Sequence, residues 1–386
     1  MYIHNMLVSR KPIVLVPGFA GSKLVAKKYV INPMTKHPKN EFINLNVSGN
    51  NDWKHRMTTL NDDVVPYDFG GVNGIRNLCD ECEYLDWYFD KVFKTKVIKN
   101  NINYTYFDDM ITNLEHKGYY GGVDLVGVPY DFRRIMHPHY MEDLFGKIKL
   151  LIENTYELTK KPVVIVAHSI GCLIMYLFLV DSVTSEWKAK HISKFISVCG
   201  PYGGCSTSLK TILSGIPAPP FLQERYHSIF QLCSGTILAF PNTLSYEKKD
   251  VIIIDAKKNK KFNTEQYIEI LPRIVKDTWY GYVETRLSSF LKNTDVDTTF
   301  VVSLDKQTDY QYIYDEIKLD GKPHKDPIAS IKKLGDNVVP IDSLLFHTKN
   351  NCMYPNYTLE VIPNQEHSYI VKSKELLNLV FQKSID

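Results

Sequence analysis

The sequence predicts an α/β protein with a mostly parallel central sheet and helices on both of its faces. Short apolar, β-branched runs alternate along the chain with segments whose apolar residues recur three or four positions apart. Such runs are typical of parallel strands buried on both faces, and such spacing is typical of amphipathic helices. A further observation is the run VVIVAHSIGCLIMYLFLV at 163–180, which changes from β-branched to unbranched residues near its centre.

Each element has its own signal in chain order. PIVLVPGFAG is a short apolar run stopped by a Pro-Gly turn, and GVDLVGVPYDFR is a run that enters a polar turn. MITNLEHKGY has helical spacing and ends at Gly118, and YMEDLFGKIKLLIENTYELTKK repeats apolar residues at the helical period. The expected strands are 12–21, 122–133, 162–168, 191–201, 298–305 and 357–367, and the expected helices are 110–119, 140–161, the apolar stretch after Ser169 and 372–383.

Two long stretches depart from this alternation. Residues 27–107 are polar, rich in Asn and aromatic residues, and poorly periodic. Residues 201–296 consist of short apolar segments broken by Gly and Pro. Neither pattern is typical of sheet core. We therefore expect a single domain over 1–386, with 27–107 inserted as a lid or interfacial region and 201–296 inserted as a cap.

Composition and charge limit the partners and the location. The net charge is only +3 and no block of Lys and Arg forms a basic arm, so no nucleic-acid partner is expected. Seven Cys residues, an odd number, together with no leader pattern at the start, predict reduced thiols and a cytoplasmic protein. The mild positive charge is compatible with peripheral attachment to an anionic membrane surface. The pair Cys79 and Cys82 lacks a second pair, so no metal and no cofactor are expected.

The run at 163–180 is either a membrane span or a strand and a helix joined by a turn. Its length is at the lower limit for a span, and His168, Ser169 and Gly171 interrupt the centre, where polar groups cost most in lipid. Ala-His-Ser-Ile-Gly between a strand and a helix is instead the context of a nucleophile elbow, in which small residues two positions either side of the Ser avoid clashes. Ser169 is therefore the candidate nucleophile, and an unreactive turn Ser is the alternative.

A nucleophilic Ser needs a His to accept its proton and an acid to orient that His, in the chain order Ser, acid, His. His367, just after the last expected strand, is the candidate base. The other His residues after Ser169 are interpreted as surface or packing residues. His168, next to the Ser, is interpreted as support for the site.

The acid has three candidates in the sequence. The segment KKLGDNVVPIDS offers Asp336 and Asp342, and Asp305 ends an expected strand. Asp336 follows a Gly in a turn and leaves room for one strand before His367. Position alone leaves the choice near even, because each Asp could be a turn-capping residue.

The oxyanion of an acyl-transfer intermediate needs two backbone donors. One is expected from the N–H of Ile170, at the start of a helix whose dipole favours negative charge. The other is expected from the loop after the first strand, in VPGFAGS, where the N–H of Phe19 is the candidate.

Five motifs occur in an order that resembles the lecithin:cholesterol acyltransferase family, which includes lysosomal phospholipase A2 and the phospholipid:diacylglycerol acyltransferases. They are PIVLVPGFAGSKL, VGVPYDFR, KPVVIVAHSIGCLIMYLFL, FISVCGPYGGCSTSLKTILSG, and LGDNVVP followed by EH. PYDFR looks like the family's Pro-Tyr-Asp-Trp-Arg, and GPYGG looks like its Ala-Pro-Trp-Gly-Gly. The resemblance runs from about residue 12 to 370.

The resemblance implies an α/β-hydrolase that takes an acyl chain from a phospholipid and passes it to water or to a lipid alcohol, a sterol or diacylglycerol. It implies Ser169 as nucleophile, His367 as base, Asp336 as acid, and the oxyanion donors named above. It also places a lid and interfacial element around Trp53, whose ring would favour the headgroup layer of a lipid surface. A Trp packed under its own loop is the alternative.

The sequence also departs from parts of this family. No Cys flanks Trp53, where secreted and lysosomal members carry a disulfide, and the membrane anchor of the yeast and plant acyltransferases is not seen. The acceptor of any one branch is therefore not carried over. Two other functions stay open: a carboxylesterase or triacylglycerol lipase on the same fold, and a catalytically inactive lipid-binding hydrolase fold.

Overall fold

The structure is a computed structural model of the chain, and it describes residues 10–31, 38–44, 64–76, 106–215, 227, 230–275, 281–318, 322–349 and 357–385. Its centre is a six-stranded sheet in the order β13-β10-β7-β6-β1-β5, in which every neighbouring pair is parallel. The predicted α/β fold with a mostly parallel central sheet is confirmed. The strands are β1 (Ile13–Val16), β5 (Leu125–Gly127), β6 (Val163–His168), β7 (Ile192–Val198), β10 (Thr298–Val302) and β13 (Tyr357–Val361).

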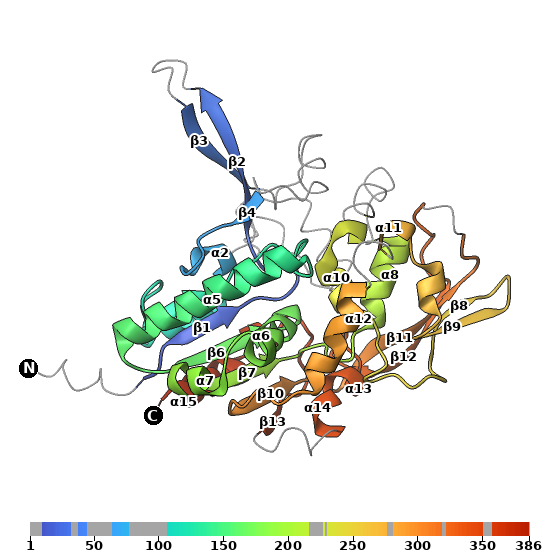
Figure 1. The fold of residues 1–386 in the computed structure, drawn as a ribbon. Helices are drawn as coiled ribbons and strands as arrows, with labels where there is room; N and C mark the ends of the chain where they lie inside the picture. Colours follow the sequence, from blue (N-terminus) through green and yellow to red (C-terminus); the bar gives the residue numbers. More distant parts are fainter. Residues whose placement is uncertain are drawn as a thin grey trace, which may run out of the picture.

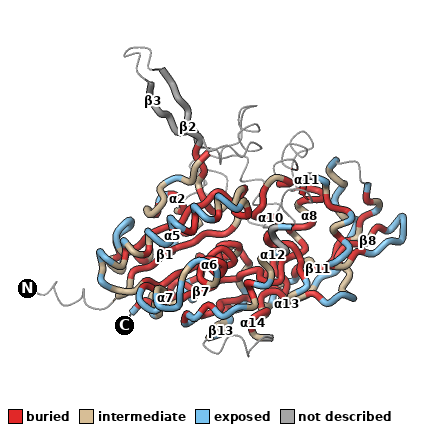
Figure 2. Tube along the Cα trace, in the orientation of Figure 1, coloured by how far each residue is buried: buried red, intermediate tan, exposed pale blue. Residues whose placement is uncertain are grey.

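All six strands lie inside segments for which the sequence predicted strands. In β1, β5, β6 and β10 every residue is buried, as Figure 2 shows for the middle of the molecule. Val and Ile suit these positions because their branched side chains pack well on a pleated surface with neighbours on both sides. Burying each such side chain contributes roughly 1.5–3 kcal/mol.

Helices cover the sheet, and the apolar run at 163–180 divides into β6 and the helix α6. Figure 1 shows α5, α6 and α7 in front of the sheet, while α4 and α15 pack against each other. In the part of the chain that the structure describes, no helix combines the length and the apolar character that crossing a membrane requires. These helices are α4 (Asp108–His116), α5 (Pro138–Thr159), α6 (Ile170–Asp181), α7 (Ser185–His191) and α15 (Lys374–Ser384).

The helix boundaries follow from local sequence signals. Gly118, expected to end a helix, has φ 89° and follows α4. Pro138 opens α5, where its missing N–H costs nothing because that group has no intrahelical partner. Ser373 caps α15 by accepting a hydrogen bond from the N–H of Leu376 at 3.2 Å.

Two smaller sheets were not predicted from the sequence. A three-stranded antiparallel sheet has the order β3-β2-β4, and Figure 1 shows its β2–β3 hairpin projecting from the body. A four-stranded sheet has the order β12-β11-β8-β9. The strands are β2 (Leu24–Ile31), β3 (Pro38–Asn44), β4 (Val64–Pro66), β8 (Val251–Asp255), β9 (Lys260–Asn263), β11 (Lys306–Tyr314) and β12 (Ala329–Gly335).

Of the short helices, α8 and α13 pack on the four-stranded sheet, whereas α2 and η4 pack against α4. The helix α8 packs on β11, and its Ser214 hydroxyl lies 2.9 Å from the hydroxyl of Tyr314. The short helical elements are α2 (Asn73–Arg76), α8 (Ser206–Ser214), α10 (Ser234–Leu238), η1 (Tyr267–Ile270), α11 (Arg273–Val275), α12 (Gly281–Leu287), η3 (Ser288–Leu291), α13 (Ile341–Leu344), α14 (Phe346–Lys349) and η4 (Ile370–Lys372).

Candidate active site

Ser169 lies in the turn between β6 and α6. Its backbone has φ 56° and ψ −129°, a region that residues other than Gly enter only under strain. The turn is tight because α6 packs against the end of β1: a Cβ on Gly171 would lie 2.4 Å from the carbonyl oxygen of Pro17. The small residue two positions after the Ser is therefore required by the close approach of helix and strand.

The structure brings Ser169, His367 and Asp336 together in one line. The Ser169 Oγ lies 2.9 Å from Nε2 of His367, and Nδ1 of His367 lies 2.7 Å from Oδ2 of Asp336. Because a carboxylate oxygen accepts, Nδ1 carries the ring proton and Nε2 is left to accept from the Ser169 hydroxyl. His367 is 5% exposed and Asp336 is 0% exposed, so this line is largely shielded from solvent.

Asp336 is held by backbone groups on both sides of its carboxyl group. Its Oδ1 accepts hydrogen bonds from the N–H of Val338 at 3.0 Å and of Val339 at 2.7 Å. Its own carbonyl oxygen accepts a hydrogen bond from the N–H of His367 at 2.8 Å. The loop after β12 and the loop after β13 are therefore joined twice, once through backbone and once through side chains.

The other candidate acids are engaged elsewhere. Asp305 accepts hydrogen bonds from the N–H of Asn364 at 2.8 Å and from the hydroxyl of Ser303 at 3.2 Å. Asp342 forms an ion pair with Lys333 at 3.1 Å. Of the three Asp residues that the sequence left open, Asp336 is the one with a hydrogen bond to the His367 ring.

The loop after β1 lies directly against Ser169. A Cβ on Gly18 would lie 2.7 Å from the Cβ of Ser169, so only Gly fits between the loop and the elbow. Phe19 is the next residue in that loop, and Ile170 begins α6, where the first N–H groups have no intrahelical partners. Phe19 thus follows the Gly that approaches Ser169, and Ile170 follows Ser169 itself; their role as oxyanion donors stays a prediction.

The motif PYDFR has a visible role in holding this loop. Arg133 and Asp131 form a buried two-pronged pair, with Nε at 2.8 Å from Oδ1 and Nη2 at 2.7 Å from Oδ2. The pair fixes the residues around it, and the Tyr130 hydroxyl donates to the Pro17 carbonyl oxygen at 2.9 Å. The Phe132 ring lies 4.9 Å from the Phe19 ring, centroid to centroid.

Tyr106 and His168 lie next to the site and are hydrogen-bonded to its loops. The Tyr106 hydroxyl accepts a hydrogen bond from the N–H of Gly18 at 2.8 Å and is hydrogen-bonded to Nδ1 of His168. The Nε2 of His168 lies 2.9 Å from the carbonyl oxygen of His367, so the residue next to Ser169 contacts the residue expected as base. The sequence analysis missed Tyr106, because it ends an aperiodic stretch and belongs to no motif.

A Cys, an Asp and a His come close enough to raise the question of a metal. Among the described residues, Cys199, Asp336 and His367 place one ligand atom each within 4.8 Å of one another. Burial and the negative charge of Asp336 raise the pKa of the Cys199 thiol well above its usual range. A protonated thiol is a poor metal ligand, and the His367 and Asp336 atoms already bond each other. The group is therefore a poor fit for a metal.

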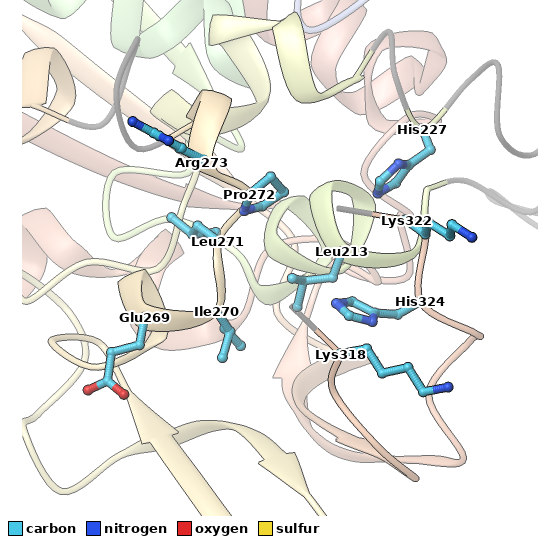
Figure 3. Close-up of a pocket in the computed structure, with 10 residues that line it drawn as sticks. All are labelled: Leu213, His227, Glu269, Ile270, Leu271, Pro272, Arg273, Lys318, Lys322 and His324. Carbon is cyan, nitrogen blue, oxygen red and sulfur yellow. The ribbon is translucent and has the colours of Figure 1, made fainter. Parts of the chain in front are cut away.

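Trp53, the predicted interfacial residue, lies outside the described residues. A cavity of about 350 Å³ lies among α8, η1 and the side chains of Lys318, Lys322 and His324, and no triad candidate is among its lining residues. Figure 3 shows the charged ends of Lys318, Lys322 and Arg273 pointing away from the middle of this group. The cavity is therefore separate from the chemistry around Ser169.

A sequence model of the lecithin:cholesterol acyltransferase family matches residues 86–269. The chain is 26% identical over 347 residues to the phosphatidylcholine-sterol acyltransferase of Oryctolagus cuniculus, covering 86% of this chain and 75% of that protein. It is 27% identical over 384 residues to the lysosomal phospholipase A and acyltransferase of Bos taurus, covering 93% and 88% respectively. The resemblance predicted from the motifs is confirmed.

The fold also has a counterpart among solved structures. A chain in the crystal structure of the Tle4–Tli4 complex superposes with a TM-score of 0.53 at 12% identity, covering 97% of this chain and 98% of that one. At this identity the likeness concerns the fold alone.

Proposed function

We propose that this relative of the lecithin:cholesterol acyltransferase family is a serine acyl hydrolase and O-acyltransferase that acts on phospholipids. The observation that carries the proposal is the hydrogen-bonded line from Ser169 through His367 to Asp336. In chain order and geometry this is the arrangement that activates a Ser hydroxyl for attack on an ester. The relatives, a phosphatidylcholine-sterol acyltransferase and a lysosomal phospholipase A and acyltransferase, support the substrate class.

The first half of the proposed reaction forms an acyl-enzyme. The Ser169 Oγ attacks the ester carbonyl of a phospholipid while its proton passes to Nε2 of His367, and Asp336 stabilises the imidazolium that results. The N–H groups of Phe19 and Ile170 donate to the oxyanion of the tetrahedral intermediate. The intermediate then expels the lysophospholipid alkoxide, which takes the proton from His367 and leaves the acyl chain on Ser169.

The second half transfers the acyl chain. Water, or the hydroxyl of a sterol or diacylglycerol, gives its proton to His367 as its oxygen attacks the acyl-enzyme. Collapse of the second intermediate releases a fatty acid or a new ester, and the proton returns from His367 to Ser169. The ring of Phe19, in the loop after β1, lies 4.9 Å from the ring of Phe132 and 5.9 Å from the ring of Phe230, centroid to centroid. These three rings offer an apolar wall for the acyl chain.

The proposal extends to the setting of the reaction. We propose 27–107 as a lid, with Trp53 at the lipid surface, and 201–296 as a cap, on a protein that attaches peripherally to membranes. The free thiols of Cys172, Cys199, Cys205 and Cys233 suit the reducing cytoplasm proposed for it. A vesicle-flotation assay with Trp53→Ala against the wild type tests the surface role, because loss of the indole ring should reduce binding.

The decisive experiment is product analysis by mass spectrometry after incubation with phospholipid vesicles, with and without sterol or diacylglycerol. Release of fatty acid or formation of sterol ester or triacylglycerol, abolished in Ser169→Ala, is the expected result. Activity on short or neutral esters only would point to a carboxylesterase or triacylglycerol lipase instead. A wild-type protein that no fluorophosphonate probe labels would mean an inactive lipid-binding fold.

A further inference from the structure

A chain of hydrogen bonds runs behind the site, from the loop after β1 to the loop that carries His367. It begins at the N–H of Gly18, which lies 2.8 Å from the Tyr106 hydroxyl. It continues from that hydroxyl to Nδ1 of His168, and from Nε2 of His168 to the carbonyl oxygen of His367 at 2.9 Å. We call these four groups the relay.

The relay has a single direction, because its ends fix the protons in the middle. The His367 carbonyl oxygen can only accept, so Nε2 of His168 carries a proton and donates it. Burial, together with the nearby His367 ring, lowers the pKa of His168 well below its usual range, so its ring is neutral and Nδ1 accepts. The Tyr106 hydroxyl therefore donates to Nδ1, and its oxygen accepts from the Gly18 N–H.

One end of the relay controls the orientation of a backbone donor. The N–H of Gly18 is held by Tyr106, and the carbonyl oxygen of Gly18 accepts a hydrogen bond from the N–H of Gly21 at 3.0 Å. Because the peptide bond is planar and trans, the direction of the Gly18 carbonyl also sets the opposite direction of the Phe19 N–H. Fixing Gly18 on both sides thus fixes the proposed oxyanion donor.

The other end of the relay holds the base. The backbone of His367 is anchored twice, with its N–H donating to the Asp336 carbonyl oxygen at 2.8 Å and its carbonyl oxygen accepting from His168. His168 itself precedes Ser169 in the elbow. A displacement at any point of the relay therefore changes the distances among the nucleophile, the base and the oxyanion loop together.

Tyr106 is well placed to be the fixed point of the relay. Its own N–H donates to the carbonyl oxygen of Arg76 at 2.9 Å, and its ring packs edge-on against Phe107 at 4.9 Å between centroids. Burial raises the pKa of its hydroxyl far above the usual range, so the hydroxyl keeps its proton. A hydroxyl held at both ends in this way has one orientation.

We propose that Tyr106 is a positioning residue that couples the oxyanion loop to the catalytic base through His168. This inference rests on the proposed use of Ser169 and His367 in acyl transfer. It assigns to Tyr106 and His168 an effect on the rate of the chemical step rather than on substrate binding, because neither side chain has to touch the acyl chain to act.

The test compares four single variants with the wild type on a soluble ester, p-nitrophenyl butyrate, and in the rate of labelling by a fluorophosphonate. Tyr106→Phe keeps the ring and removes the first link, and His168→Asn removes the link to His367. Tyr130→Phe frees the Pro17 carbonyl, which shares one peptide unit with the Gly18 N–H, and so disturbs the relay from its loop end. Tyr119→Phe removes a buried hydroxyl far from the site, one that donates to the Lys11 carbonyl oxygen at 3.0 Å.

Tyr106→Phe is expected to lower kcat about tenfold to hundredfold with KM changed less than about threefold, and to slow labelling in proportion. Tyr119→Phe is expected to lower the melting temperature at unchanged kcat, which separates positioning from folding. The double variant Tyr106→Phe with His168→Asn should be no slower than the worse single variant, because one relay is broken twice. Combining Tyr130→Phe with His168→Asn should likewise cost less than the product of the two single losses, because both variants disturb the same relay.

Two outcomes would overturn the relay: a kcat of Tyr106→Phe within about twofold of the wild type, or losses that multiply in the Tyr106 and His168 double variant. These outcomes differ from a failure of the proposed function. A wild type that is labelled but releases no phospholipid acyl chain contradicts the proposed function alone. A wild type that is not labelled contradicts both.

Discussion

The central sheet and the four-stranded sheet contribute to the site in different ways. Ser169 and His367 follow β6 and β13 of the central sheet, whereas Asp336 follows β12 of the four-stranded sheet. Every residue of β10 in the central sheet is buried, but most of β12 is exposed, with Ile331 at 49% and Leu334 at 47% exposure. The proposed nucleophile thus follows a fully buried strand, β6, whereas the proposed base and acid each follow a strand at the edge of its sheet, β13 with no buried residue and β12 with one.

The placement of Asp336 next to His367 depends on contacts between the two sheets. The strands of the central sheet are parallel neighbours, so their carboxyl ends meet at one edge without further help. Asp336 comes from another sheet, and its loop is bonded to His367 by the side-chain bond of 2.7 Å and the backbone bond of 2.8 Å. These two hydrogen bonds connect the two sheets at the site.

The largest effect on activity is expected from losing the side-chain bond between Asp336 and His367. Asp336→Asn should lower kcat by about a thousandfold or more, because an amide favours the wrong tautomer of His367. The measurement is steady-state kinetics on a soluble ester, with the melting temperature as a check on folding. Asp305→Asn is the matched control, since its carboxyl group bonds the Asn364 N–H and not the ring, and it should lose less than about tenfold. A crippled Asp305→Asn beside a mild Asp336→Asn would contradict the geometry.

The sequence predicted the central sheet because most of its strands are buried apolar runs. Runs such as IVLV in β1 and VVIVAH in β6 are apolar throughout, and they were found within a few residues. The strand β12 was not predicted, because its sequence ASIKKLG has no apolar face that alternates with a polar one. Antiparallel strands near a sheet edge carry their signal in pairing, which one sequence does not reveal.

The site was predictable to the same extent as its local patterns. Ser169 has an elbow motif, and His367 is placed by the strand before it. The choice among the acids needed the resemblance, because each Asp sits in a turn and turns look alike in sequence. Tyr106 could not be found, since its contacts with Gly18 and His168 join residues 88 and 62 positions away.

A smaller effect is expected at the elbow. Gly171→Ala should lower the free energy of unfolding by about 1–3 kcal/mol and reduce activity, because the new methyl would press on the Pro17 carbonyl oxygen. Gly146→Ala in α5 is the matched control, because a Cβ there meets nothing within 4 Å. This change should raise the free energy of unfolding by about 0.5–1 kcal/mol. Both are measured by urea denaturation. Equal effects of the two changes would mean that α6 does not pack closely on β1.

The segment between the acid and the base gives a test in pH. Burial lowers the pKa of His347 well below its usual range, while its ring stacks on Phe300 of β10 at 4.2 Å between centroids. The unfolded chain binds a proton below the ordinary pKa and the folded chain does not. Stability is therefore present above about pH 6.5 and is lost as pH falls, by up to about 1.4 kcal/mol per pH unit for this group.

His347→Phe should flatten this dependence, because the Phe ring keeps the stacking and cannot titrate. The measurement is the free energy of unfolding at several pH values between about 5 and 8 in both proteins. Part of the slope should survive in the variant, since burial also lowers the pKa of His168. A variant with the same slope as the wild type would show that His347 is not kept neutral in the fold.

The smallest effect is expected where the two sheets differ most, at the exposed face of β12. Leu334→Ala should change the free energy of unfolding by no more than about 0.5 kcal/mol, because the side chain is already half in solvent. Val301→Ala in β10, where the side chain is 0% exposed, should cost roughly 2 kcal/mol although it removes fewer atoms. Urea denaturation of both variants measures the pair. A large loss of stability in Leu334→Ala would mean that β12 is covered in the protein in solution. The edge that carries Asp336 would then be as enclosed as β6, the strand before Ser169.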